Sequence, residues 1–225
     1  MRPWLGIARS LDALNAAARG ICTESGRQIC FVAPSSEGGP YELRVHESGR
    51  IHTRAGNLHD WFNALCWLAF PRTKARINAM HAAAIPHEQG QRGRLRDLLT
   101  IFDEGGAIVV SADAELVQLV RDFRWKELFW QQRERLRTRM RFIVLGHAVL
   151  EQALKPWPGI TCKALFASPA DDLDARAAEW LSQRGPDASP RDLAPLPVFG
   201  YPGWAENDRA EFYDDDRYFR QGKAG

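Results

Sequence analysis

Apolar side chains recur with helical spacing in the segment LHDWFNALCWLAF, residues 58–70. They cover most of the circumference of the helix that this pattern predicts over residues 58–69, so this helix should be largely buried. Asn57 precedes it as a suitable N-cap, and Pro71 stands where a second helix can begin at its first position. We therefore expect two consecutive helices that join at Phe70 and Pro71.

Shorter apolar runs elsewhere in the chain predict strands. ICFVAP, residues 29–34, is β-branched and aromatic and ends at a proline, and GITCKALFAS, residues 159–168, has the same character. YELRVHESGRIHTR, residues 41–54, and LTIFDEGGAIVVSAD, residues 99–113, each contain two apolar runs around a glycine-containing turn. These two segments are predicted to be β-hairpins.

Several further segments show helical periodicity. The predicted helices cover residues 4–19, 114–123 after the N-cap Asp113, 125–140, 141–154 with an interruption at Gly146, and 171–183. From Gly185 onward prolines are frequent, which predicts an extended segment. The apolar residues of this segment indicate that it wraps over the body of the protein.

The order of the predicted elements favours an α+β fold. Helices and short hairpins are interspersed without a regular βαβ rhythm, and 225 residues are enough for one domain with its own core. We therefore predict a mainly helical single domain with two short β-hairpins and an extended C-terminal arm. Residues 1–56 form an N-terminal helix and hairpin, residues 57–184 a helical core with one hairpin, and residues 185–225 the arm.

Composition narrows the class of protein without naming its activity. The chain is 45% hydrophobic and 26% charged, and its net charge of +2 gives no global attraction to nucleic acid or to an anionic membrane. The longest apolar run, Leu65–Phe70, is far shorter than the ~20 residues of a membrane span. The N-terminus lacks the apolar region of a signal peptide, so we expect a cytoplasmic protein.

The four cysteines show neither a CxxC pair nor zinc-ribbon spacing. Reduced thiols fit this pattern, and a disulfide between Cys22 and Cys30 is the alternative.

Polar residues that titrate or hydrogen-bond interrupt the two apolar helices. His59 and Asn63 are four residues apart, and Lys74, Asn78 and His81 follow on one face of the second helix. Two readings remain open for this set. Either it is a hydrogen-bonded network that fixes the helix pair, or it lines a polar pocket, because titratable groups with shifted pKa values gather at functional sites.

Asp103 lies at the predicted tip of the second hairpin, where it can be a turn-forming residue, a cation ligand or a general base. His147 and Glu151 are again four residues apart, which permits either an intrahelical hydrogen bond or a shared metal ion. No HExxH, GxSxG or P-loop motif occurs, which disfavours a zinc protease of that type, an α/β-hydrolase and a nucleotide-cradling loop.

The first hypothesis is therefore a metal-assisted hydrolase. The predicted metal ligands are His59, His81, Asp103 and His147, and these histidines are also the candidate acids and bases. Glu151 is the second carboxylate, Asn63 and Asn78 orient the substrate, and Lys74 holds its phosphate or carboxylate group.

The second hypothesis is a non-catalytic binding or scaffolding protein. Arg121 to Arg141 contains eight basic and three acidic residues with interleaved aromatic side chains, which are the components of a groove for single-stranded RNA. The alternation of Arg133, Arg135, Arg137 and Arg139 favours a solvated helix with an aromatic underside. The acidic C-terminal segment AENDRAEFYDDDRYFR can pair with this basic helix and close the fold.

Six strings occur in order between about Pro40 and Arg220: HDWFNALCWLAFPRTKARINAMH, LRDLLTIFDEGGAIV, RFIVLGHAVLEQAL, PGITCKAL, PLPVFGYPGW and EFYDDDRYFR. Together they resemble a bacterial domain-of-unknown-function family, number 3025. The resemblance implies a single soluble domain. It transfers no catalytic residue to this chain.

Overall fold

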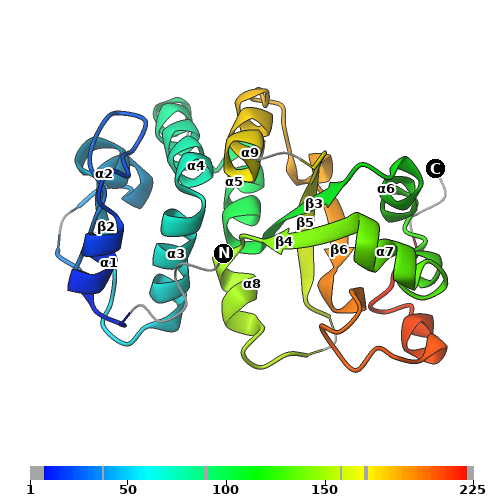
Figure 1. The fold of residues 1–225 in the computed structure, drawn as a ribbon. Coiled ribbons are helices and arrows are strands. Elements are labelled where there is room, and N and C mark those ends of the chain that lie inside the picture. Colours follow the sequence, from blue (N-terminus) through cyan, green and yellow to red (C-terminus); the bar gives the residue numbers. More distant parts are fainter. Residues whose placement is uncertain (1–7, 37, 89–90, 158, 170–171, 222–225) are drawn as a thin grey trace. The chain divides into compact units, whose positions relative to one another are not determined.

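The computed structural model describes residues 8–36, 38–88, 91–157, 159–169 and 172–221 (Figure 1). The chain divides into two compact units, each with its own hydrophobic core. The first comprises Met1–Asp103 and Asp174–Ser189, and the second comprises Glu104–Leu173 and Pro190–Gly225. Both helices and strands are present, so the predicted α+β class is confirmed.

The first unit consists mainly of helices around one two-stranded sheet. Its elements are α1 (Leu11–Ala17), β1 (Cys30–Val32), α2 (Tyr41–Ser48), β2 (Arg50–His52), α3 (Leu58–Ala69), α4 (Pro71–Ala84), the short η1 (Ile85–His87), α5 (Arg94–Gly105) and α9 (Leu173–Ser182). The chain passes into the second unit near the end of α5. Leu14, Phe31, Val45 and Ile51 are buried in the core of this unit.

The helix pair α3 and α4 begins and ends as the hydrophobic pattern predicts. Asn57 caps α3 through its side-chain oxygen, which accepts from the backbone N–H of Asp60 at 2.9 Å. Pro71 is the first residue of α4, whose own N-terminus has no local side-chain cap. Asp174 of α9 fills that role, since its carboxylate accepts from the backbone N–H groups of Arg72 and Thr73 at 2.8 Å each.

The first predicted hairpin, residues 41–54, is wrong. Residues 41–48 form α2, with Val45 fully buried, and the helix ends at Gly49, which has a φ of 71°. A left-handed glycine is a common helix terminator, and a side chain here would also collide with the backbone oxygen of Gln28. Only β2 forms a strand, and it pairs in parallel with β1.

The second unit is built on a four-stranded sheet of order β4-β3-β5-β6 (Figure 1). Its elements are β3 (Gly106–Ser111), α6 (Ala114–Arg121), the π-helical turn η2 (Glu127–Gln131), α7 (Arg133–Arg139), β4 (Met140–Val144), α8 (His147–Gln152), β5 (Thr161–Ala167), η3 (Pro190–Asp192), β6 (Ala194–Pro197), η4 (Val198–Gly200) and η5 (Ala210–Asp214). Asp113 caps α6, as predicted.

The second predicted hairpin, residues 99–113, is also wrong. Leu98, Leu99 and Phe102 fall on one side of α5, so the first apolar run is helical. The second run is β3, a fully buried strand that pairs antiparallel with β4 and parallel with β5. Its continuous apolar sequence is typical of a central strand that is covered on both faces.

The predicted helices over residues 125–140 and 141–154 are also corrected. The first breaks into η2 and α7, and Met140 already starts β4. The second contains β4 and then α8, with Gly146 at the junction. A Cβ on Gly146 would lie 2.5 Å from the backbone nitrogen of Gly106, so the glycine permits a close backbone approach.

The prediction that the C-terminal arm wraps over the body is confirmed for residues 190–221, which belong to the second unit. Tyr218 donates its hydroxyl to the backbone oxygen of Ile160 at 2.7 Å. The indole of Trp125 donates to the backbone oxygen of Arg220 at 2.8 Å. The division of the chain at residues 56 and 184 stays a prediction.

The remaining predictions concern short segments, cysteines and membrane spans. The strands near residues 29–34 and 159–168 and the helix near 171–183 are present, while the predicted helix 4–19 is described only from residue 8 and forms over Leu11–Ala17. All four cysteines are free, so Cys22 and Cys30 form no disulfide. Among the described residues, no helix combines the length and the apolar character that crossing a bilayer requires.

Candidate functional site

Lys74 is the centre of a polar cluster in the first unit. It lies on the inner face of α4 and is only 3% exposed. Its ammonium donates to the side-chain oxygen of Asn63 at 2.8 Å and to the carboxylate of Asp103, and it lies 5.6 Å from the ring centroid of Trp67. The three predicted residues Asn63, Lys74 and Asp103 are therefore brought together from α3, α4 and α5.

The two partners of the ion pair between Lys74 and Asp103 differ in their exposure to solvent. The Lys74 side chain is 4% exposed, whereas the Asp103 side chain is 22% exposed. Removing one partner of a buried ion pair costs ~3–5 kcal/mol, because the remaining charge is then uncompensated. Lys74 thus stabilises an ionised carboxylate that solvent can still reach.

Tyr41, at the start of α2, extends this network through a side-chain hydrogen bond with Asn63. Burial of its hydroxyl raises the pKa far above the usual range of a phenol, and the charge of Asp103 adds to this effect. Tyr41 is nevertheless 38% exposed as a residue. It is therefore a neutral hydroxyl at the edge of the cluster.

His81 lies further along the same face of α4 and is 3% exposed. Its Nδ1 accepts a hydrogen bond from Nε of Arg96 at 3.0 Å, and the carboxylate of Glu42 lies 4.0 Å from the same nitrogen. Burial lowers the pKa of His81 to about 4; Glu42 opposes this shift, and Arg96 supports it. The ring is therefore neutral at physiological pH.

Asn78 lies between Lys74 and His81 on α4 and is 5% exposed. Its Nδ2 donates to the backbone oxygen of Glu42 at 2.8 Å, and this bond fixes the orientation of the amide because a carbonyl can only accept. Its Oδ1 is buried and has no hydrogen-bond partner among the described protein atoms. An unpaired buried acceptor costs about 1–3 kcal/mol.

Four members of the cluster were not among the predicted site residues: Tyr41, Glu42, Glu88 and Arg96. The first two were assigned to a hairpin, where their side chains could not be placed against α4. Pro40 before residues 41–48 and Gly49 after them are the signals that a helical interpretation would have used. Glu88 follows η1 and pairs with Arg96 at 2.7 Å, a contact without a local sequence signal.

Cys66 on α3 adjoins the same charges. Burial raises the pKa of this thiol to about 12, and Lys74 only partly opposes the shift. The thiol therefore stays protonated and behaves as a small apolar group.

The other predicted site residues have different surroundings. His59 is half-buried at the start of α3, near Asp60. Burial raises the pKa of the Asp60 carboxyl group, but hydrogen bonds from Arg54 outweigh burial and lower this pKa. His59 adds a smaller part of the lowering. His147, 5% exposed, and Glu151 lie on α8 of the second unit. They are not members of the cluster within the first unit.

Within the described ranges, no three His, Cys, Asp or Glu side chains come together as a metal site. The predicted ligands His59, His81, Asp103 and His147 therefore do not form such a group there. For His81 one cause is local, because Nδ1 of its ring already accepts a hydrogen bond from Arg96. A metal ion thus has no support from the positions of these side chains.

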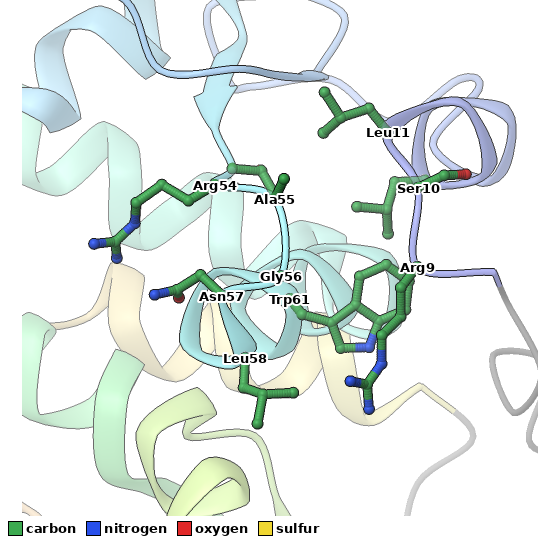
Figure 2. A pocket seen from close by; sticks show the side chains of 11 residues that line it. Arg9, Ser10, Leu11, Arg54, Ala55, Gly56, Asn57, Leu58 and Trp61 are labelled. Carbon is green, nitrogen blue, oxygen red and sulfur yellow. The ribbon is translucent and has the colours of Figure 1, made fainter.

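A separate hollow of the first unit lies where the segment after β2 meets the first turn of α3 and the start of α1 (Figure 2). Arg54 and Asn57 are among its polar lining residues. The side chain of Arg54 donates two hydrogen bonds to Asp60, at 2.8 and 2.9 Å, and Asn57 caps α3. Because both side chains are engaged and none of the predicted site residues lines the hollow, we do not place the site there.

Several side chains of the basic segment already have partners within the second unit. Arg135 forms a two-point ion pair with Asp113 at 2.7 and 2.8 Å. Lys126 pairs with Asp214 at 2.6 Å, and Arg133 donates to the backbone oxygen of Asn207 at 3.0 Å. The contacts of Lys126 and Arg133 support the predicted closure of the fold by the C-terminal segment more than a surface that binds RNA.

Comparison with known proteins places the chain in one family. The family model whose description is "Protein of unknown function (DUF3025)" matches residues 29–223, most of the chain. Searches of curated proteins and of solved structures gave no match. The argument for function therefore rests on the polar cluster itself.

Proposed function

We propose that this chain, which belongs to the family of proteins of unknown function DUF3025, is a hydrolase whose general base is Asp103. The observation that carries the proposal is the ion pair of Asp103 with the buried Lys74, which stabilises a carboxylate that solvent can reach. A carboxylate placed in this way can take a proton from water without a metal ion. Lys74 acts through Asp103 and is a positioning residue.

The reaction is the hydrolysis of an ester. Asp103 accepts a proton from a water molecule as the water oxygen bonds to the acyl carbon. The bond between that carbon and the ester oxygen then breaks, and the proton passes from Asp103 to the leaving alkoxide. Tyr41 and His81 are the neutral groups of the cluster that can donate hydrogen bonds to the developing charge.

The charges of the cluster bear on the kind of substrate. Three cations, Lys74, Arg92 and Arg96, act on the three carboxylates of Glu42, Glu88 and Asp103. Because these charges balance, the cluster does not attract an anionic substrate. The phosphate or carboxylate group predicted from Lys74 gains no support, because the ammonium already donates to Asn63 and Asp103.

Asn78 adds one feature of that substrate. Its buried Oδ1 accepts no hydrogen bond from the described protein atoms, so a hydroxyl or amino group of the ligand would find a partner there. The proposed substrate class is therefore a small ester that carries a hydroxyl or amino group.

The test uses the p-nitrophenyl esters of glycine, glycolic acid and acetic acid. We expect the whole chain to hydrolyse the first two faster than the third. Asp103→Asn should lower the rate about 100-fold or more, and Asn78→Leu should remove the preference. Asp97→Asn, a carboxylate on the same helix outside the cluster, is the matched control and should keep the rate. A rate equal to that of buffer with all three esters, or an unchanged rate in Asp103→Asn, would contradict the proposal.

A further inference from the structure

The hydrogen bond between Arg96 and His81 determines where the imidazole carries its proton. Nε of Arg96 lies 3.0 Å from Nδ1 of His81. A guanidinium has five N–H donors and no acceptor, so the ring nitrogen that faces it must offer a lone pair. A neutral imidazole carries one proton, which is then on Nε2.

Arg96 is itself fixed in place. One terminal nitrogen donates to Glu88 at 2.7 Å and the other donates to Glu42 at 3.0 Å. Glu88 is anchored in turn, because its second oxygen accepts from the backbone N–H of Gly93 at 2.6 Å. The Arg96 side chain is 12% exposed, and three contacts therefore hold its planar group against the ring.

Other charges also act on His81. Glu42 and Asp103 favour the protonated ring, while Arg96 and Arg92 disfavour it. The contact geometry decides between the protonated and the neutral ring. A proton on Nδ1 would point at the N–H of Arg96 Nε, and the two nitrogens are only 3.0 Å apart. Glu42 is 4.0 Å away and already accepts from Arg96.

We propose that Arg96 is a positioning residue that holds His81 as the neutral tautomer protonated on Nε2. The ring then supplies the site with a fixed hydrogen-bond donor, and neither nitrogen is a base or a metal ligand. This inference deepens the proposed function. It rests on that function in one respect only, namely that an oxygen of the substrate accepts a hydrogen bond from Nε2.

The test reads the tautomer directly. Two-bond proton–nitrogen correlation spectra of the ¹⁵N-labelled chain distinguish the neutral tautomers and the imidazolium, and the His81→Gln spectrum assigns the signals. We expect His81 to keep an unprotonated Nδ1 and a protonated Nε2 from about pH 5 to about pH 8. An imidazolium, or a proton on Nδ1, in the unaltered chain at neutral pH would overturn the proposal.

Variants separate the role of Arg96 from that of burial. In Arg96→Met the ring stays buried but loses the guanidinium while Glu42 remains, so we expect its protonation midpoint to rise. Arg94→Met, an exposed neighbour on the same helix, should change nothing. An unchanged tautomer and midpoint in folded Arg96→Met would overturn the positioning role.

Arg96→Lys covers the case in which the methionine variant does not fold. A lysine keeps the positive charge and an N–H donor, so the Nε2 tautomer should persist, and its loss would count against the proposal. No substrate is needed for these measurements. Absence of ester hydrolysis together with the expected tautomer would therefore overturn the proposed function alone.

Discussion

Asn78 donates a hydrogen bond to the backbone oxygen of Glu42 at 2.8 Å, which ties the middle of α4 to the first turn of α2. This bond joins the two halves of the polar cluster. Lys74 and His81 flank Asn78 on α4, and Tyr41 and Glu42 face them from α2. The cluster therefore depends on α2 being a helix.

Replacement of Lys74 by methionine tests the ion pair as a source of stability. Asp103 and Asn63 lose their donor, and we expect the free energy of unfolding to fall by about 3 kcal/mol. Urea unfolding followed by tryptophan fluorescence measures this change. The control is Arg176→Met, which breaks the exposed pair with Glu179 and should cost less than ~1 kcal/mol. Equal losses in the two variants would contradict the prediction.

Gly146→Ala tests the close backbone approach between the β4–α8 junction and the residues where α5 passes into β3. The new Cβ would lie 2.5 Å from the nitrogen of Gly106 and 2.6 Å from the oxygen of Glu104, and backbone atoms cannot give way cheaply. We expect a loss of ~1–3 kcal/mol in urea unfolding. Gly185→Ala is the matched control, since nothing lies within 4 Å of its Cβ position. A Gly146 variant as stable as this control would show that the junction can relax.

Asn207 should anchor the C-terminal segment. It is 1% exposed, and its Nδ2 donates to the backbone oxygens of Phe199 and Tyr201 at 2.8 Å each. Asn207→Asp keeps the shape but removes both donors. The buried Phe199 carbonyl then loses its partner at a cost of about 1–3 kcal/mol, while the Tyr201 carbonyl keeps the backbone N–H of Trp204. Urea unfolding should report the loss, and so should hydrogen exchange of the Phe199 amide, whose own bond to the Tyr218 hydroxyl depends on the same segment staying in place; both readouts are expected to change. Gln183→Ala, at an exposed position, should leave both unchanged.

His81 should make stability depend on pH. Its pKa falls from 6.5 to about 4 on folding, so between these values the unfolded chain binds more protons than the native chain. The contribution is complete above the unfolded pKa and is lost as the pH falls through this window. It amounts to about 3 to 4 kcal/mol at most, from ~1.4 kcal/mol per unit of pKa.

Urea unfolding at several pH values within this window measures the slope. In His81→Gln the slope should be shallower than in the unaltered chain, whereas His87→Gln, at an exposed position, should keep it. Parallel curves for the unaltered chain and His81→Gln would contradict a buried neutral ring.

The fold predictions succeeded where local signals were complete. The α3–α4 pair was placed correctly because Asn57 caps the first helix and Pro71 starts the second. The segments 41–48 and 99–105 were misassigned because short apolar runs fit a helix as well as a strand. Neighbouring segments decided between the two, as the pairing of β3 with β4 and β5 illustrates.

The amino-acid sequence by itself determined the α+β class, the main helix pair and the polar face of Lys74, Asn78 and His81. Their spacing follows from helical periodicity alone. Only the tertiary structure decided what this face meets: Asp103 from α5, Glu42 from α2, and Arg96 with its N–H against His81. Such contacts join residues far apart in the chain, and no local pattern encodes them. They arise because a buried charge or amide must find its partner wherever packing brings one within reach.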